Sequence, residues 1–408
     1  LQPSVPKTDA LSSCATGAQA TRLRATSVDY GKPRDTTPAG HHGSPGYSSQ
    51  TGKRPAVLRT LTFRGHHTES LPAPSAHLSL VRGAVAMIRI PILAGILVLG
   101  TVGHATPDDR VAPLTANAND QGIEVREGKQ PVLFYQRTPK SQEGKFQRAH
   151  YVHPLYDLDG NVLTEDFPAD HPHHRGIFWA WHQVWLGDRK LGDPWLASDF
   201  SWQVYTVETT LPNPDLLQLR CFVTWTSPQA VDALSARLPL VRETTTIRIH
   251  RAGPGHRNVD FRIELQALQA KMRIGGSEDA KGYGGFSPRI RLPEGIRFRG
   301  ETGLVEPQRT AVQGGAWMDI VGHFSEQSDP SGLAILCHPD NPGFPQGWIL
   351  RSSGSMQNAA YPGQHPVPLS LKSPLVLSYR LVLHRGEPEP SVLARWHQDF
   401  TSPSAASP

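Results

Sequence analysis

The chain has 408 residues, with 41 lysines and arginines against 36 aspartates and glutamates and a formal net charge of +5. Ten of the basic residues but only four of the acidic ones lie in positions 1–86, which leaves 31 basic and 32 acidic residues for the rest. The positive charge therefore belongs to the first 86 residues. The remainder gives no electrostatic argument for binding nucleic acid, and we expect no such partner.

Residues 1–86 are rich in Ser, Thr, Gly, Pro, Ala and His and show no sustained apolar period, which is typical of a disordered or linker segment. Met87 opens a run with a basic start, a short apolar stretch and a small-x-small end at Gly103-His104-Ala105. This pattern predicts a secretory signal peptide over residues 87–105. Because such a peptide is read at the N-terminus, we interpret residues 1–86 as an over-extended gene prediction and expect a periplasmic or secreted protein. The alternative is a true N-terminal arm followed by a signal anchor.

The rest of the chain predicts a β protein. Residues 106–124 are polar and predict a linker, and residues 401–408 predict a disordered tail. Between them, short apolar or alternating runs are separated by Gly, Pro, Asn and Asp. The clearest strand candidates are residues 131–137, 219–226, 243–250, 259–265 and 375–383. A helical period is found over residues 388–400. Many short strands without interleaved helices predict a single all-β domain over residues 125–400, a large antiparallel β-sandwich.

Cys221 and Cys337 both lie in strand-like apolar runs. A disulfide is permitted in an exported protein, but buried free cysteines are also common, so the sequence leaves their pairing open. After residue 105, no stretch is long and apolar enough to cross a bilayer, and we expect no membrane span in the mature chain.

Residues 170–185 carry the strongest chemical signal of the chain, with four histidines, an arginine, an aspartate and three tryptophans. Pro172 favours an extended loop at the start, and residues 177–184 can continue as a strand. In such a strand, Phe178, Ala180 and His182 share one face, and Ile177, Trp179 and Trp181 share the other. The candidate catalytic residues are His173, His174, Arg175 and His182. The candidate substrate-binding residues of this run are His171, Trp179 and Trp181.

Three interpretations of this run compete. In an acid–base and anion-binding site, a histidine would move a proton and Arg175 would hold an oxygen. In a metal site, His171, His173 or His174 would act with His182 and a carboxylate, but the run lacks standard ligand spacing, and we expect no metal and no cofactor. In a structural role, the histidines cap turns and the tryptophans fill the core.

Two further segments offer weaker candidates. The glycine-rich stretch 281–291 contributes Lys281, Tyr283 and Arg289 as possible ligand donors, or it is a hairpin with solvated basic residues. The stretch 337–348 contributes His338 and Asn341, or it is a proline-braced turn. Three isolated carboxylates on apparent strands could supply a base to a histidine acid if they face the site: Glu243, Glu264 and Asp319.

The element Asp170-His-Pro-His-His-Arg-Gly176, with Tyr151–Tyr156 before it and Cys337–Pro342 after it, resembles a bacterial family of unknown function. This family is often labelled "methane oxygenase PmoA", and the resemblance covers about residues 125–388. It implies a secreted β-sandwich protein, common in bacteria that degrade polysaccharides. The chain also looks like the galactose-mutarotase type of supersandwich, in which a His acid and a Glu base act on the anomeric centre of a sugar. No residue pair of this chain aligns with that His and Glu.

The sequence therefore predicts an exported carbohydrate-active protein whose substrate is a small molecule or an oligosaccharide. If it is an enzyme, we expect an epimerase, lyase or hydrolase that uses histidine acid–base chemistry. A non-catalytic carbohydrate-binding protein is the first alternative, and a metal-dependent oxygenase, as the family label suggests, is the second. The substrate, the reaction and the oligomeric state stay open.

Overall fold

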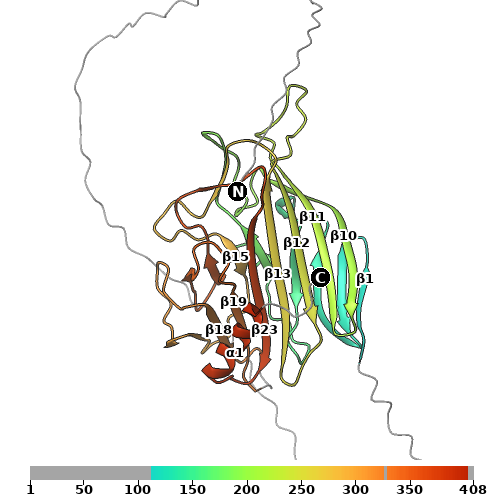
Figure 1. The fold of residues 1–408 in the computed structure, drawn as a ribbon, viewed down its shortest axis with the longest axis vertical. Helices are drawn as coiled ribbons and strands as arrows, with labels where there is room; N and C mark the ends of the chain where they lie inside the picture. Colours follow the sequence, from blue (N-terminus) through green and yellow to red (C-terminus); the bar gives the residue numbers. More distant parts are fainter. Residues whose placement is uncertain (1–111, 326–328, 403–408) are drawn as a thin grey trace, which may run out of the picture. The chain divides into compact units, whose positions relative to one another are not determined.

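A computed structural model describes residues 112–325 and 329–402, and the described residues form an antiparallel β fold with one helix (Figure 1). The predicted all-β class is thereby confirmed. The alternation seen in the sequence is the cause, because successive side chains of a strand point to opposite faces. In Val241–His250, for example, Val241, Glu243 and Thr245 are buried, whereas Arg242 is exposed.

The larger sheet has nine strands in the order β10-β11-β12-β13-β23-β19-β18-β16-β17. All neighbouring pairs within it are antiparallel. Its strands are β10 (Ser201–Asn213), β11 (Leu216–Thr226), β12 (Val241–His250), β13 (His256–Ala267), β23 (Leu375–Arg385), β19 (Ser331–Cys337), β18 (Trp317–Gly322), β16 (Arg297–Gly300) and β17 (Gly303–Leu304).

The second sheet has six strands in the order β1-β2-β3-β6-β7-β15. They are β1 (Leu114–Ala118), β2 (Gly122–Glu127), β3 (Gln130–Gln136), β6 (Tyr151–Leu155), β7 (Ile177–Ala180) and β15 (Gly285–Pro288). The strand β1 lies inside residues 106–124, which were expected to be a linker. The β fold therefore begins earlier than predicted, because the short polar strand β1 pairs with β2 along its whole length.

Three small sheets complete the fold. A four-stranded sheet contains β22 (Val367–Pro368), β14 (Met272–Gly275), β8 (Gln183–Leu186) and β9 (Arg189–Lys190). Two-stranded sheets are formed by β20 (Gly347–Ile349) with β21 (Asn358–Ala360), and by β4 (Lys140–Gln142) with β5 (Lys145–Arg148).

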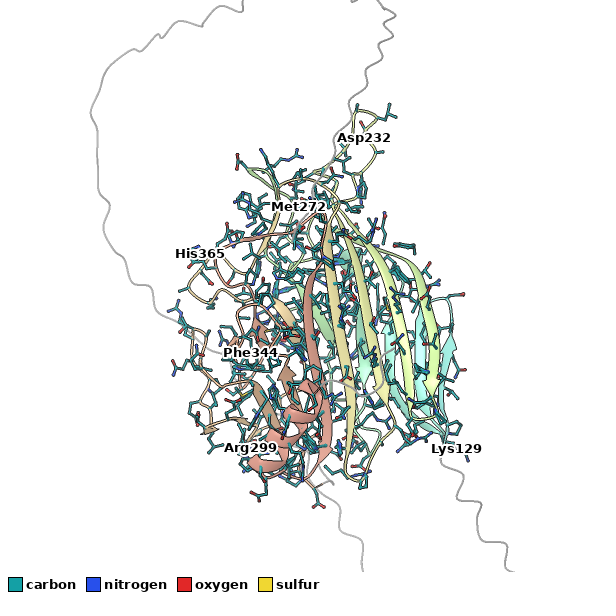
Figure 2. All side chains as sticks on the ribbon, viewed as in Figure 1. Lys129, Asp232, Met272, Arg299, Phe344 and His365 are labelled. Atoms are coloured by element: carbon teal, nitrogen blue, oxygen red, sulfur yellow. The ribbon has the colours of Figure 1, made fainter. Side chains whose placement is uncertain are left out.

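The core lies between the two large sheets. One continuous cluster of buried apolar side chains takes members from both, and the Trp179 ring of β7 lies 6.1 Å from the Phe261 ring of β13. Burial of apolar area on this scale is the main favourable term in folding. Figure 2 shows side chains filling this layer, with Met272 towards one end of the sheets and Arg299 towards the other.

The predicted helix is confirmed as α1 (Pro390–Thr401). Pro390 stands at its first turn, where a missing backbone N–H costs nothing. Leu393 joins Trp317, Leu336 and Val382 in a separate apolar cluster, so the helix covers the outer face of β18, β19 and β23 (Figure 1).

Three further predictions concern the cysteines, membrane spans and the two ends of the chain. Cys221 and Cys337 are both buried free thiols. Among residues 112–325 and 329–402, no helix is long and apolar enough to cross a membrane. The predicted extension 1–86, the signal peptide 87–105 and nearly all of the tail lie outside the described residues.

Candidate functional site

Four histidines of one segment lie together in space, and we call His171, His173, His174 and His182 the imidazole cluster. The rings of His171 and His174 are stacked, with centroids 4.7 Å apart and an interplanar angle of 3°. The His173 ring stands edge-on to both of them, at 5.7 and 4.6 Å. Trp195 connects His174, at 5.8 Å, to His182, at 5.3 Å. The structure thus brings all four predicted histidines to one place.

The local backbone explains this grouping. Residues 168–176 form turns instead of the extended loop expected from Pro172: the backbone N–H of His174 donates to the carbonyl of His171 at 2.9 Å. This turn places the two rings over each other. The chain then enters β7, where Ile177 and Trp179 belong to the core, as does Trp181 just after the strand, and Phe178 and Ala180 belong to a second apolar cluster on the other face. The predicted division of the two faces is confirmed, although the strand is interrupted between β7 and β8.

His182 forms a dyad with Asp193, since its Nδ1 lies 2.8 Å from Asp193 Oδ2. A carboxylate accepts, so Nδ1 carries the proton and Nε2 is left as the acceptor of the neutral ring. Among the described residues, this Nε2 is buried and has no hydrogen-bond partner. Trp195 stacks on one face of the ring and Tyr283 stands edge-on at 4.9 Å. The dyad therefore offers an oriented basic nitrogen.

His173 is held only by ring contacts, from His171, His174 and Phe146. Within residues 112–325 and 329–402 it makes no hydrogen bond, and neither ring nitrogen is sealed from solvent. Burial lowers its pKa to about 4, assisted by the charges of His171, Arg148 and His182. At neutral pH His173 is consequently an unprotonated imidazole whose two nitrogens are free for a ligand.

His174 is more constrained. Its side chain is buried, and burial together with the neighbouring His173 and His171 lowers its pKa to about 2. Its Nδ1 lies 3.5 Å from Arg289 Nη1, which can only donate, so the proton of the neutral ring sits on Nε2. Arg289 in turn donates to Glu165 at 2.7 Å and to Asp170 at 2.8 and 3.0 Å. Arg289 therefore links His174 to the carboxylates of Glu165 and Asp170.

Asp170 also binds His171, whose Nδ1 lies 2.7 Å from Asp170 Oδ2. Burial alone would raise the pKa of Asp170, but hydrogen bonds from His171 and Arg289 outweigh it and lower the pKa to about 2. Asp170 is thus a carboxylate at neutral pH, and it orients His171 as Asp193 orients His182.

Arg148 is a buried cation next to the cluster. Its guanidinium lies 4.0 Å from the Trp202 ring and 5.2 Å from the Phe178 ring. One nitrogen donates to the carbonyl of Pro194, and Nε has no partner among the described residues. Burial lowers the pKa of Arg148 to about 9, and the charge of Arg175 adds to this effect. Arg148 helps to keep His173 unprotonated.

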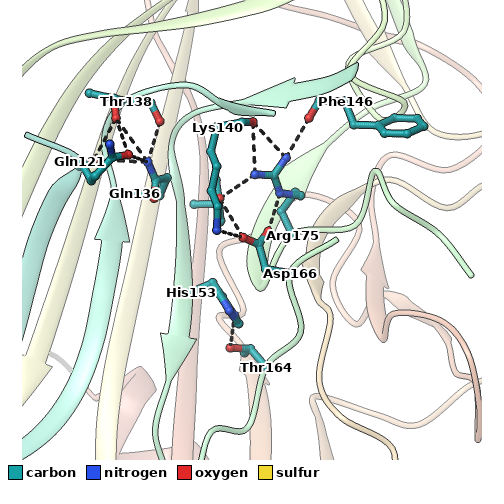
Figure 3. Close-up of polar contacts among 10 residues, drawn as sticks. Gln121, Gln136, Thr138, Lys140, Phe146, His153, Thr164, Asp166 and Arg175 are labelled. Carbon is teal, nitrogen blue, oxygen red and sulfur yellow. Dashed lines mark hydrogen bonds and ion pairs between the residues drawn. The ribbon is translucent and has the colours of Figure 1, made fainter. Parts of the chain in front are cut away.

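Arg175 follows His174 directly, but its guanidinium is bound to Asp166 and to the backbone of the β4–β5 hairpin (Figure 3). Its Nε donates to Asp166 at 2.5 Å, Nη1 to the carbonyls of Phe146 and Lys140, and Nη2 to Tyr151 and again to Lys140. All three nitrogens are therefore bound to protein oxygens. The predicted role of Arg175 in holding a substrate oxygen stays a prediction, and it would require one of these bonds to break.

Trp179 and Trp181 are buried in the core. Trp179 Nε1 donates to Glu243 at 2.6 Å, and Trp181 Nε1 donates to the carbonyl of Tyr361 at 2.9 Å. Neither ring presents a free face, so their predicted role in binding a substrate also stays a prediction. The aromatic rings with partial exposure next to the histidines are those of Phe146 and Tyr283.

The two weaker segments separate in space. Tyr283 joins the imidazole cluster, and Lys281 lies over its ring at 5.4 Å. In contrast, His338 lies edge-on to Phe400 of α1, and the Asn341 side chain binds the backbone of Ser378. The structure does not bring His338 and Asn341 to the histidines.

Glu243 belongs to a second histidine–carboxylate group, which we call the core network: Tyr135, His150, Trp179, Trp225, Glu243 and Thr245. Glu243 lies between the two large sheets and accepts from His150 at 2.8 Å, from Trp225 at 2.6 Å and from Thr245 at 2.8 Å. Burial alone would raise its pKa, but these partners, His150 first, lower it. His150 also binds the Tyr135 hydroxyl at 2.6 Å.

The other two isolated carboxylates are also tied to neighbours. Asp319 is buried with His384 at 2.8 Å, and Glu264 pairs with Arg262. The sequence reasoning missed Arg148, Asp193 and Trp195. The stretch Asp193-Pro-Trp195 is polar and aromatic, but only the hairpin β8–β9 returns it to His182. Across the described part of the chain, no group of three or more His, Cys, Asp or Glu residues is placed to hold a metal ion.

The fold and site thus describe an antiparallel β protein with a histidine-rich loop. The chain belongs to a family of unknown function, DUF6807, which matches residues 122–398. No curated protein is significantly similar to it in sequence. Among solved structures, a "putative mutarotase (YeaD)" from Salmonella typhimurium is similar at a TM-score of 0.29 and 9% identity, over 67% of this chain and 94% of that one. A likeness of this size carries no argument about this chain.

Proposed function

We propose that the imidazole cluster is an acid–base site for a hydroxylated small molecule, a sugar or oligosaccharide. The observation that carries this proposal is His173, a neutral imidazole with two unpartnered nitrogens. A group with a pKa below the ambient pH and a free nitrogen can accept a proton from a substrate hydroxyl or an activated C–H bond. His173 is the proposed general base.

Two carboxylates favour an enzyme over a simple sugar-binding protein. Asp193 orients His182, and Asp170 orients His171. A carboxylate behind a histidine fixes its tautomer and stabilises the ring when it takes up a proton. A protein that only binds sugars has no need of two such pairs beside an unbound imidazole.

The environment suits a substrate with hydroxyl groups. The Nε2–H of His174 can donate to an oxygen, and Phe146 and Tyr283 supply partly exposed rings against which the apolar face of a sugar can pack. An exported protein meets such substrates outside the cytoplasm, and we propose a periplasmic or secreted location on the basis of residues 87–105.

The proposal is tested with a panel of mono- and oligosaccharides in D2O, followed by proton NMR. Anomer exchange, loss of a C–H signal, new vinylic signals and bond cleavage report mutarotation, epimerisation, elimination and hydrolysis. His173→Ala should lower turnover about 100-fold or more, the usual contribution of a general acid or base. The exposed His365, labelled in Figure 2, gives the matched control His365→Ala, which should leave turnover unchanged.

The alternatives give different results. Saturable sugar binding without any turnover would leave the non-catalytic binding protein, and neither binding nor turnover across the panel would overturn the proposal. Elemental analysis of the purified protein tests the oxygenase alternative, since a stoichiometric transition metal would support that reading against ours.

A further inference from the structure

A pocket of about 510 Å³ lies beside the imidazole cluster but takes its walls from other segments. Three loops supply most of these walls: residues 280–282, 342–347 and 360–364. Apart from Lys281, Gln346, Tyr361 and Gln364, the lining residues of these loops are Gly, Pro and Ala, whose short side chains leave backbone amides and carbonyls close to the space. The volume is within the range of ligand-binding pockets. None of the four clustered histidines lines it.

Gln346 provides an unsatisfied acceptor in the wall of this pocket. The residue is 2% exposed, and its Nε2 donates to the carbonyl of Pro342 at 3.3 Å. Its Oε1 is buried and has no donor among the described residues. A buried carbonyl without a partner costs free energy, about 1–3 kcal/mol. A ligand hydroxyl against this wall would supply the missing donor after a small rotation of the amide.

Tyr361 and Lys281 add two further polar groups. The Tyr361 hydroxyl makes no hydrogen bond within the described residues and is not sealed from solvent. Lys281 Nζ lies 3.0 Å from Asp279 Oδ2, so its charge is already balanced. The pocket therefore offers hydrogen-bonding groups and an aromatic ring without an unpaired charge. Such a lining matches a neutral molecule rich in hydroxyl groups.

We infer that this pocket is a second binding site, separate from the imidazole cluster, for a neutral saccharide. The segment 281–283 joins the two sites, because Lys281 lines the pocket and Tyr283 contacts His182. Trp181 ties the pocket to the sheet by its bond to the Tyr361 carbonyl. This inference does not depend on catalysis at the cluster, since a saccharide can be held in the pocket whether or not it reacts elsewhere.

The experiment is isothermal titration calorimetry of the full protein with maltose, cellobiose and lactose, and with glucuronate as the charged comparison. We expect one of the neutral disaccharides to bind. Gln346→Leu should weaken that binding at least tenfold and leave the thermal midpoint equal or higher, because it removes the unsatisfied carbonyl and keeps the volume. Gln308→Leu, at an exposed position, is the matched control and should bind as the unmodified protein does.

Tyr361→Phe is the second variant and should weaken binding several-fold without unfolding the pocket. His173→Ala should retain the binding, which separates the pocket from the proposed acid–base site. Three results would overturn the inference: no binding of any neutral disaccharide, equal binding by Gln346→Leu, or loss of binding in His173→Ala. If turnover is absent but binding depends on Gln346, the proposed function fails and the second site stands.

Discussion

The imidazole cluster and the core network both join histidines to carboxylates, and they differ in how fully their polar atoms are bonded. In the core network, both oxygens of Glu243 and both nitrogens of His150 have partners inside the sandwich. In the imidazole cluster, His173 has none and His182 has one. Saturated bonding holds a fold in place, whereas unpaired nitrogens at a loop are available to a ligand.

The largest effect on stability is expected at Glu243, in the core network. Glu243→Ala leaves His150 and two indole N–H groups buried without an acceptor, so the free energy of unfolding should fall by about 3–5 kcal/mol. Urea unfolding measures this loss. Glu208→Ala, at a position half exposed on β10, is the control and should change stability by less than about 0.5 kcal/mol. A stable Glu243→Ala protein that has lost turnover would instead place Glu243 in the active site.

Arg175 gives the next largest effect. Arg175→Met removes five hydrogen bonds and leaves Asp166, which is 4% exposed, with Lys140 as its remaining cation. We expect the free energy of unfolding to fall by about 2–4 kcal/mol in urea. Arg175→Lys should recover only part of the loss, because the ammonium of lysine cannot form the several hydrogen bonds that the planar guanidinium makes in fixed directions. A variant with unchanged stability but no saccharide binding would restore the ligand-holding role predicted from the sequence.

The sequence predicted the fold more completely than the site. Period-2 alternation in residues 243–250 and 259–265 identified strands, because one face of each is buried against the other sheet. It also placed Trp179 and Phe178 on opposite faces correctly. It missed β1, whose five residues are too short and polar to show a pattern.

For the site, the residue types located the histidines, but they did not show which hydrogen-bond partners each side chain has. Arg175 and His173 are two residues apart in the same motif, yet one is saturated and the other is free. That difference depends on Lys140 and Phe146, which the β4–β5 hairpin brings from distant positions, and on Asp166, which precedes Arg175 by nine residues. Hydrogen-bond saturation is a property of tertiary structure, and no local pattern encodes it.

Acid should destabilise the protein through the imidazole cluster. The pKa values of His173 and His174 are depressed to about 4 and 2, so the unfolded chain binds protons more readily than the folded one below about pH 6.5. The stability they contribute is complete above that pH and is lost as the pH falls. Between pH 7 and 5 we expect a loss of roughly 2–3 kcal/mol, after allowance for the partial exposure of His173.

Urea midpoints measured at pH 7, 6 and 5 test this loss. The double variant His173→Gln with His174→Gln should show a flatter pH dependence than the unmodified protein. His365→Gln is the control and should follow the unmodified protein. An unchanged slope in the double variant would show that these two histidines do not carry depressed pKa values.

The smallest predicted effect is the difference in stability cost between removing the hydroxyl of Tyr151 and removing that of Tyr283. The Tyr151 hydroxyl is buried, accepts from Arg175 at 2.7 Å and lies 3.3 Å from Asp166. The Tyr283 hydroxyl makes no hydrogen bond within the described residues. Tyr151→Phe should therefore cost about 1–2 kcal/mol, and Tyr283→Phe less than about 0.5 kcal/mol.

Turnover should reverse this order. Because Tyr283 contacts His182 and has a free hydroxyl, Tyr283→Phe should raise KM or lower kcat in the NMR assay while its unfolding curve stays unchanged. Tyr151→Phe should lose stability but keep kcat once folded. Equal stability costs for the two variants would mean that Tyr283 is as firmly bonded as Tyr151. The distinction between a saturated and an open polar group would then fail at the position where it is easiest to measure.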